Sequence, residues 1–168
     1  SNENAENFIN KVYKIENTLL CGLGCRDSLR VEAGLSLYGN EINEDITPIQ
    51  ANLSWAIDKK RLDDENLNGS NILLQQLQET KDTVKIGITP VNKTMLRNNM
   101  TLHNMEKNEI GYITSGCFSP TLKRSIGIGY INNFTNKLDK LFVKVRGEFE
   151  EVIIDNIPFV KKNYKKGG

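Results

Sequence analysis

Histidine, tryptophan and cysteine are scarce in this 168-residue sequence, which contains 1 His, 1 Trp and 3 Cys. A closed structural zinc site needs four nitrogen or sulfur ligands at short paired spacings, and Cys21 and Cys25 form only one such pair. With His103 as the single histidine, a Ser/His/Asp catalytic site or a metal site is hard to build. We therefore expect no metal, and we expect Cys21, Cys25 and Cys117 to be buried or half-buried thiols in a reducing compartment.

An excess of charge of either sign is also missing, because 22 Lys and Arg face 21 Asp and Glu and the formal net charge is +1. A general nucleic-acid binder or a polybasic membrane-surface protein needs basic charge gathered on one face. No apolar run approaches the roughly 20 residues of a membrane-spanning helix, and residues 1–10 show no signal-peptide pattern. The sequence thus favours a globular protein with neither nucleic acid nor a membrane as partner.

The first third of the sequence has the pattern of an α/β fold. Apolar residues at helical spacing predict helices over Ala5–Glu16 and Arg26–Leu37, the second with Asp27 and Ser28 available as caps. A sheet of one or two strands is not stable alone, so residues 1–58 look like the end of a domain that begins upstream. The other elements predicted here are a strand over Thr18–Leu23, a short helix over Thr47–Asn52 and a strand over Ser54–Ile57.

The remaining sequence changes from a helical to an alternating pattern. Residues 59–80 read as a polar connection and a helix over Asn71–Glu79 with Ser70 as its N-cap. Residues 81–168 read as a small barrel or sandwich, in which Arg146–Gly147 is a two-residue hairpin signal and Thr101–Asn108 a hairpin turn. The expected fold class is α+β, the end of an α/β domain followed by a small all-β, barrel-like domain. The predicted strands are Val84–Thr89, Ile110–Thr114, Ser125–Ile131, Leu141–Val145 and Glu148–Ile154.

A glycine-rich turn, Cys21–Asp27, follows the first predicted strand. It is not a dinucleotide fingerprint, because Asp27 stands where the third glycine is needed and would repel a pyrophosphate. Arg26 beside the two glycines can instead point into a crevice at the end of the sheet, where its fork of donors suits a carboxylate or a polarised carbonyl. An ion pair with Asp27, Glu32 or an upstream residue is the structural alternative.

The small and turn-forming residues of Thr114–Leu122 predict a loop between two strands. Ser115 and Cys117 are conceivable nucleophiles, but no general base accompanies them and the G-x-S-x-G motif is absent. Loop packing is therefore the favoured interpretation of this stretch.

Four stretches of the sequence carry recognisable motifs. The first is the run Gly22–Leu35 followed by Leu37–Asn40, which is similar to the motif G-L-x-A-R-D-[ST]-L-R-L-E-A-G-[LM], with Cys25 in place of the usual alanine. The other three are Thr47–Pro48 with Leu53–Trp55 (T-P…L-S-W), Ile113–Leu122 (I-T-S-G-x-x-S-P-[ST]-L), and Ile157–Val160 with Asn163–Tyr164 (P-F-V…N-Y). Together the four stretches resemble the glycine cleavage system T-protein family of aminomethyltransferases, in its mitochondrial form.

This resemblance implies an enzyme that releases ammonia from the aminomethyl-lipoyl group of a carrier, the H-protein, and transfers the methylene group to tetrahydrofolate. It places Arg26, Trp55 and Tyr164 at the folate, with Tyr164 closing the pocket. It also implies the mitochondrial matrix as location, or the cytoplasm if the protein is bacterial. The carrier is acidic in this family, so basic residues near the Thr114 loop and the end of the sequence are candidates for contact with it; the alternative is that they are solvated surface charges. These residues are Lys123, Arg124, Lys161, Lys162, Lys165 and Lys166.

The chain departs from the family in lacking its catalytic aspartate and its G-Y-T-G-E folate motif, which lie in the first half of the family's proteins. No catalytic residue is therefore assigned, and we expect the chain alone to be inactive and to bind folate weakly. Alternatives are the folate domain of a dimethylglycine or sarcosine dehydrogenase or a demethylase, and a non-catalytic interaction module. A folate-binding protein of the iron–sulfur assembly type is disfavoured, because its K-G-C-Y-x-G-Q signature is absent.

Overall fold

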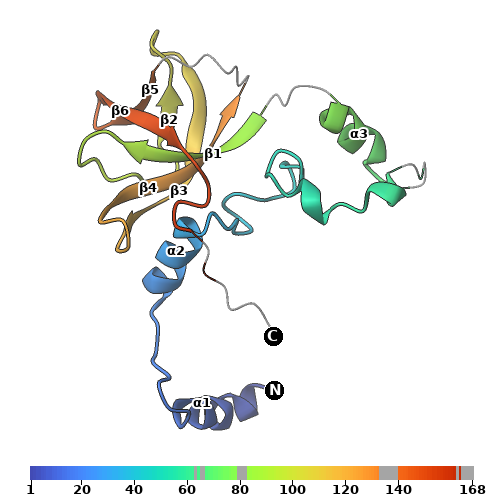
Figure 1. Cartoon of the computed structure of the whole chain (residues 1–168), viewed down its shortest axis with the longest axis vertical. Coiled ribbons are helices and arrows are strands. Elements are labelled where there is room, and N and C mark those ends of the chain that lie inside the picture. Colours follow the sequence, from blue (N-terminus) through green and yellow to red (C-terminus); the bar gives the residue numbers. More distant parts are fainter. Residues whose placement is uncertain (63, 65–66, 79–82, 133–139, 162, 164–168) are drawn as a thin grey trace.

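The computed structural model describes residues 1–62, 64, 67–78, 83–132, 140–161 and 163. Within these residues, six antiparallel strands close into a barrel, which is the upper part of the molecule in Figure 1. The strands are β1 (Thr83–Pro90), β2 (Thr101–His103), β3 (Glu109–Ser119), β4 (Arg124–Asn132), β5 (Leu141–Val145) and β6 (Glu148–Asp155). Around the barrel they follow the order β1-β4-β3-β2-β5-β6, and because β6 pairs with β1 the sheet has no free edge.

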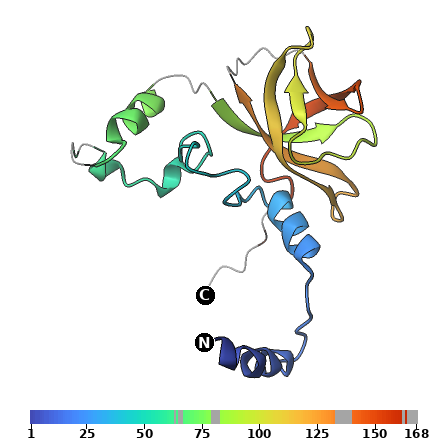
Figure 2. The ribbon, with the colours of Figure 1, turned by 180° about the vertical axis from the view of Figure 1, so that it is seen from behind.

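The helices lie outside the barrel. In chain order the helical elements are η1 (Asn2–Asn4), α1 (Ala5–Tyr13), α2 (Leu23–Glu32), η2 (Ser54–Ala56), η3 (Lys59–Arg61) and α3 (Ser70–Gln78). Helix α2 packs on β3 and β4, whereas α1 lies away from the barrel at the end of an extended segment and α3 lies to its side, as both views show (Figures 1 and 2). None of the helices in the described part of the chain is long and apolar enough to cross a membrane.

Strand β4 is buried on both faces, which positions α2 on the barrel. Successive side chains of a strand point to opposite faces, so Ile131 belongs to the interior of the barrel while Ile126 and Ile128 lie on its outer face. Val31 of α2 covers that outer face together with Ile157 and other residues of the chain's end. The interior cluster consists of aliphatic side chains from all six strands and one loop, namely Ile86, Ile88, Leu96, Leu102, Ile113, Ile131, Leu141, Val143 and Val152.

Helix α2 ends in a Schellman motif at Gly34. Gly34 has a φ of +68°, its N–H donates to Val31 O (2.9 Å), and Leu35 N–H donates to Arg30 O (2.8 Å). A side chain at Gly34 would be strained by this φ and would collide with Ile157. Gly34 therefore ends the helix, and its lack of a side chain leaves the space that Ile157 occupies.

The expected α+β class with a barrel is confirmed, and so are most of the predicted elements. The helices predicted over Ala5–Glu16 and Asn71–Glu79 are present as α1 and α3, and the five predicted strands are present as β1 and β3 to β6. Arg146 and Gly147 both have positive φ, of 50° and 96°, as a two-residue hairpin requires. The domain boundaries at residues 58 and 80 stay a prediction.

The predicted limits of the second helix are wrong. It begins at Leu23 rather than Arg26, because Gly22 in an extended conformation is its N-cap, and neither Asp27 nor Ser28 caps it. It ends at Glu32 rather than Leu37, because the positive φ of Gly34 cannot continue a helix.

Three further predictions in the first third are wrong. Thr18–Leu23 is not a strand, because none of the described residues lies beside it to form a ladder. Thr47–Asn52 forms turns instead of a helix, and Asn52 with a φ of +58° ends them. Ser54–Ile57 holds the 3-10 turn η2 rather than a strand, with Ile57 N–H donating to Ser54 O at 3.2 Å.

Two predictions within the barrel are also wrong. The loop predicted over Thr114–Leu122 belongs largely to β3, which continues to Ser119 before the chain turns. The hairpin turn predicted over Thr101–Asn108 begins with strand β2, whose three residues are too few to show an alternating pattern. Small and polar residues suggested loops in both places, but barrel closure holds them in the sheet.

Gly111 provides a test of how tightly the barrel is packed. A Cβ at this position would lie far inside van der Waals contact of Tyr130 O, a backbone atom that cannot move away easily. We expect Gly111→Ala to lower the free energy of unfolding by about 1–3 kcal/mol in urea denaturation followed by circular dichroism. The control is Gly24→Ala on α2, where a Cβ meets nothing and a better helix former should stabilise by up to about 1 kcal/mol. Equal effects of the two variants would contradict the tight packing of β3 on β4.

Candidate functional site

The exposed side of α2 forms one wall of a cavity of about 650 Å³. Arg26, Leu29 and Ala33 contribute from the helix, and Val160 and Lys161 contribute from the end of the chain. Val160 N–H donates to Glu32 O (3.1 Å), which holds that segment beside the helix. The cavity thus depends on two segments that are far apart in the sequence.

Arg26 lines this cavity and is exposed. Within the part of the chain that the structure describes, its guanidinium makes no hydrogen bond or ion pair. The alternative ion pairs are not formed, because Asp27 pairs with Arg30 and Glu32 accepts hydrogen bonds from the barrel. The donors of Arg26 therefore remain available to a ligand.

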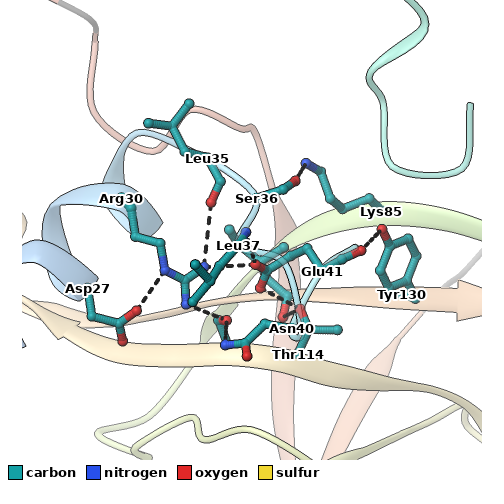
Figure 3. A network of polar contacts seen from close by, with 12 residues as sticks. Asp27, Arg30, Leu35, Ser36, Leu37, Asn40, Glu41, Lys85, Thr114 and Tyr130 are labelled. Carbon is teal, nitrogen blue, oxygen red and sulfur yellow. Dashed lines mark hydrogen bonds and ion pairs between the residues drawn. The ribbon is translucent and has the colours of Figure 1, made fainter. Parts of the chain in front are cut away.

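Arg30, one helical turn further along α2, is instead buried against the barrel (Figure 3). Its guanidinium donates to Glu41 Oε2 (2.8 Å), to Asp27 Oδ1 (2.6 Å) and to Ser115 Oγ (2.7 Å). It reaches the Leu35 carbonyl at 3.5 Å. All three guanidinium nitrogens are thus engaged, and Arg30 joins the helix to strand β3.

Glu41 is completely buried and occupies the centre of this network. Thr114 Oγ1 donates to Glu41 Oε1 (2.8 Å), and Leu37 N–H donates to Glu41 Oε2 (2.9 Å). Its backbone carbonyl accepts a hydrogen bond from the Tyr130 hydroxyl (2.7 Å). Burial raises the pKa of Tyr130, and the charge of Glu41 raises it further, so the hydroxyl stays a donor.

Glu32 makes a second link between α2 and the barrel. Its carboxylate accepts hydrogen bonds from Ser119 Oγ, from Thr121 N–H (3.2 Å) and from Thr121 Oγ1 (2.8 Å). Burial opposes ionisation of Glu32, but these hydrogen bonds outweigh it and the pKa of Glu32 is lowered. The carboxylate is therefore held ionised against the turn that follows β3.

A smaller cavity of about 260 Å³ adjoins the first and shares Ala33, Leu35 and Ser36 with it. Trp55 lines this second cavity with 81% of its surface exposed. Lys85 of β1 also lines it, is buried, and donates from Nζ to Ser36 Oγ at 2.8 Å. Burial lowers the pKa of Lys85, which the charge of Glu41 partly opposes.

The residues first considered as nucleophiles or metal ligands have structural partners. Ser115 accepts from Arg30, and burial raises the pKa of Cys117 to about 11, so its thiol is a poor nucleophile. His103 contacts Thr101 Oγ1 (2.8 Å) and Lys107 O (3.1 Å) through its two ring nitrogens. Among the described residues, no group of three or more His, Cys, Asp and Glu side chains is arranged to hold a metal ion.

Comparison with known families decides which fold this is. Residues 81–161 match the family model described as "Glycine cleavage T-protein C-terminal barrel domain", and residues 1–61 match the "GCVT N-terminal domain". The chain belongs to the glycine cleavage T-protein family. The resemblance found in the sequence is confirmed, and the barrel that the first of these models names is the one formed by β1 to β6.

Individual T-proteins agree with this assignment. The mitochondrial aminomethyltransferase of Pisum sativum is 40% identical over 148 residues, which are 88% of this chain and 36% of the pea protein. That of Homo sapiens is 36% identical over 154 residues, covering 91% of this chain and 38% of the human protein. The crystal structure of aminomethyltransferase T from Bartonella henselae has a TM-score of 0.87 at 32% identity, over 96% of this chain and 45% of that one. The chain therefore spans well under half the length of the T-proteins it matches.

The structure brings together three of the stretches that carry the family resemblance. Arg30 and Glu32 of the first stretch contact Ser115, Ser119 and Thr121 of the third. Val160 of the fourth stretch donates to the backbone of Glu32. It does not bring Arg26 and Trp55 into one cavity, although the two cavities adjoin. Tyr164, like Lys162, Lys165 and Lys166, lies outside the described residues.

Sequence reasoning missed the network of Arg30, Glu32 and Glu41. The available signal was two charged residues in the middle of a short helix, combined with a hydroxyl-rich stretch at Thr114–Thr121 that can satisfy them. Nothing in the sequence indicates that Glu41 is buried, because it lies in an acidic segment that has the composition of an exposed loop.

Replacing Arg30 tests whether the network holds α2 on the barrel. Arg30→Met leaves the Glu41 carboxylate buried without its cation, so we expect a loss of about 3–5 kcal/mol in the free energy of unfolding. The matched control is Arg26→Met, which removes an exposed arginine from the same helix and should change stability by at most about 0.5 kcal/mol. Urea denaturation measures both. Similar losses in the two variants would show that the buried pair does not determine stability.

The lowered pKa of Glu32 predicts a pH-dependent contribution to stability. Because the folded-state pKa lies below the ordinary value of 4.5, the unfolded chain takes up the proton first and Glu32 stabilises the fold above that pH. We expect Glu32→Gln to cost about 1.5–3 kcal/mol at neutral pH, and we expect this difference to shrink as the pH falls below 4.5. Exposed Glu106→Gln controls for the loss of one charge. A cost that is independent of pH would contradict this role of the carboxylate.

Proposed function

We propose that the chain forms the C-terminal part of an aminomethyltransferase of the glycine cleavage system. In this proposal the complete enzyme releases ammonia from the aminomethyl-lipoyl group of the H-protein and transfers the methylene group to tetrahydrofolate. The observation that carries the proposal is the exposed guanidinium of Arg26 in the cavity beside α2, which no described residue pairs with, in a chain that belongs to the T-protein family.

The chemistry of the two cavities supports a folate as the ligand. A folate combines a flat heteroaromatic ring system with carboxylates, and the larger cavity, at about 650 Å³, is within the usual range for small-molecule sites. Arg26 offers a planar set of donors that suits a carboxylate or a ring carbonyl. Leu29 and Leu35 form an apolar part of the wall of the larger cavity. The exposed indole of Trp55, in the adjoining smaller cavity, provides a flat aromatic surface. Tyr164 remains the third folate contact that we propose.

The chain itself supplies the binding surface rather than the catalytic acid or base in this proposal. The carboxylates of the inner network, Glu32 and Glu41, already accept hydrogen bonds from the barrel and from Arg30, although Glu32 also lines the cavity of Arg26. The relatives are much longer than the matched region, so their remaining part has room for the group that moves the proton. We therefore propose that this chain alone is inactive.

The lipoylated H-protein is the partner that we propose. Of the basic residues considered for this contact, Lys123 and Lys161 are exposed, whereas Arg124 donates to Asp155 at 2.9 Å and is partly engaged. The relatives from pea and human are named mitochondrial, which supports a location in the mitochondrial matrix rather than a bacterial cytoplasm.

A chimeric enzyme tests the function. It joins the part of the pea aminomethyltransferase that precedes the matched region to the present 168 residues. We expect tetrahydrofolate-dependent release of ammonia from aminomethyl-lipoyl H-protein by the chimera, and none by the 168 residues alone. A folded chimera with no such activity, or activity of the short chain alone, would argue against the proposal.

The same chimera tests the role of Arg26. Loss of a charge-assisted hydrogen bond should lower kcat/KM for tetrahydrofolate about 10- to 100-fold in Arg26→Met. Arg97→Met is the matched control, because Arg97 is an exposed arginine that lines neither cavity. If both variants keep the parent value, the guanidinium of Arg26 does not bind the folate.

A further inference from the structure

Two cysteines lie four positions apart at the start of α2. Cys21 directly precedes the N-cap Gly22, and Cys25 lies in the first turn of the helix. Both thiols are exposed, contrary to the expectation of burial, and both line the same cavity as Arg26. Cys117 differs from them because it is half-buried, and burial raises its pKa to about 11.

The first turn of α2 separates the two cysteines. Cys25 N–H and Arg26 N–H both donate to Gly22 O, at 3.1 and 3.3 Å, so the chain turns back on itself directly after Cys21, and both cysteines line one cavity. Among the described residues, no atom lies where a Cβ of Gly22 or Gly24 would be, so this turn has room to adjust. Cys21 is also the main cause of the raised pKa of the Cys25 thiol, through a hydrogen bond and through its charge, in agreement with this proximity.

We propose that Cys21 and Cys25 are a dithiol modification site, which a small disulfide such as oxidised glutathione converts into an intramolecular disulfide. One cysteine thiolate attacks the small disulfide, forming a mixed disulfide and releasing one small thiol. The second cysteine thiolate then attacks the protein sulfur of that mixed disulfide and releases the other small thiol. Two S–H bonds of the protein are replaced by one S–S bond, and the small disulfide is reduced to two thiols, which carry the two protons.

The geometry favours closure of the ring over a stable mixed disulfide. A disulfide needs Cα atoms within about 7 Å of each other, and the open space around Gly22 and Gly24 lets the chain between Cys21 and Cys25 adjust to that distance. The second thiol is also present at an effective concentration in the millimolar range or above. A disulfide here would cross-link the cavity wall beside Arg26, and it does not depend on the function proposed for that cavity.

Mass spectrometry of the 168-residue chain tests this site. The chain is equilibrated with oxidised glutathione, quenched in acid, alkylated and digested with trypsin, which places Cys21 and Cys25 together in the peptide Ile15–Arg26. We expect this peptide to be two hydrogens lighter and unalkylated, while Cys117 in its own peptide remains alkylated. Reduction with dithiothreitol should restore two alkylatable thiols.

Single-cysteine variants separate ring closure from general thiol reactivity. In Cys21→Ser and Cys25→Ser the remaining thiol has no partner, so glutathione adducts should be about tenfold more abundant than in the parent chain. Cys117→Ser is the matched control and should behave as the parent. The proposal is overturned if the parent carries as much glutathione on this peptide as the single-cysteine variants, or if the disulfide joins two chains on a non-reducing gel.

Discussion

The buried ion pair between Arg30 and Glu41 is the interaction on which the arrangement of this molecule depends. Taking two charges out of water costs several kcal/mol for each ion, so such a pair is tolerated only when its hydrogen bonds are complete. Here they are complete, since Ser115, Thr114 and the backbone of Leu37 satisfy the remaining positions. Among the described residues, no buried side-chain nitrogen or oxygen lacks a partner. A network of this kind has one geometry, and it therefore fixes how α2 sits on the barrel.

That orientation places two arginines of one short helix in different environments. Arg30 faces the barrel and is neutralised, whereas Arg26 lies one turn earlier at the cavity, and none of the described residues pairs with its donors. The two residues have the same chemistry and lie four positions apart in one helix. Their roles differ because β3 and β4 cover one side of α2 and leave the other side open.

This difference also shows how far the sequence alone could lead. The period of apolar residues predicted α1, α3 and the longer strands, because helices and strands with one buried face repeat that pattern. The choice of Arg26 as a site residue came from its place beside two glycines and from the family resemblance. The burial of Arg30 could not be predicted in this way, since it depends on hydroxyl groups of β3 that are more than eighty residues away.

The mistaken elements have the same origin. Thr18–Leu23 has the composition of a strand, but a strand exists only beside another strand, and none of the strands in the described part of the chain pairs with this segment. Thr114–Leu122 has the composition of a loop, yet the pairing of β3 with β4 extends the sheet to Ser119. The local sequence sets the preference of a segment for helix, strand or loop. Pairing with a distant strand can change the outcome, as it does in the barrel.

The docking of Val160 beside Glu32 has a consequence for the order of folding. The strand pairings that close the barrel join residues fewer than 70 positions apart, whereas the cavity wall joins segments separated by more than a hundred residues. Closing so long a loop costs conformational entropy that is recovered only when the final contact forms. The barrel should therefore be assembled first during synthesis, and the ligand cavity should be completed only once residues 157–161 have left the ribosome and reached a helix made long before.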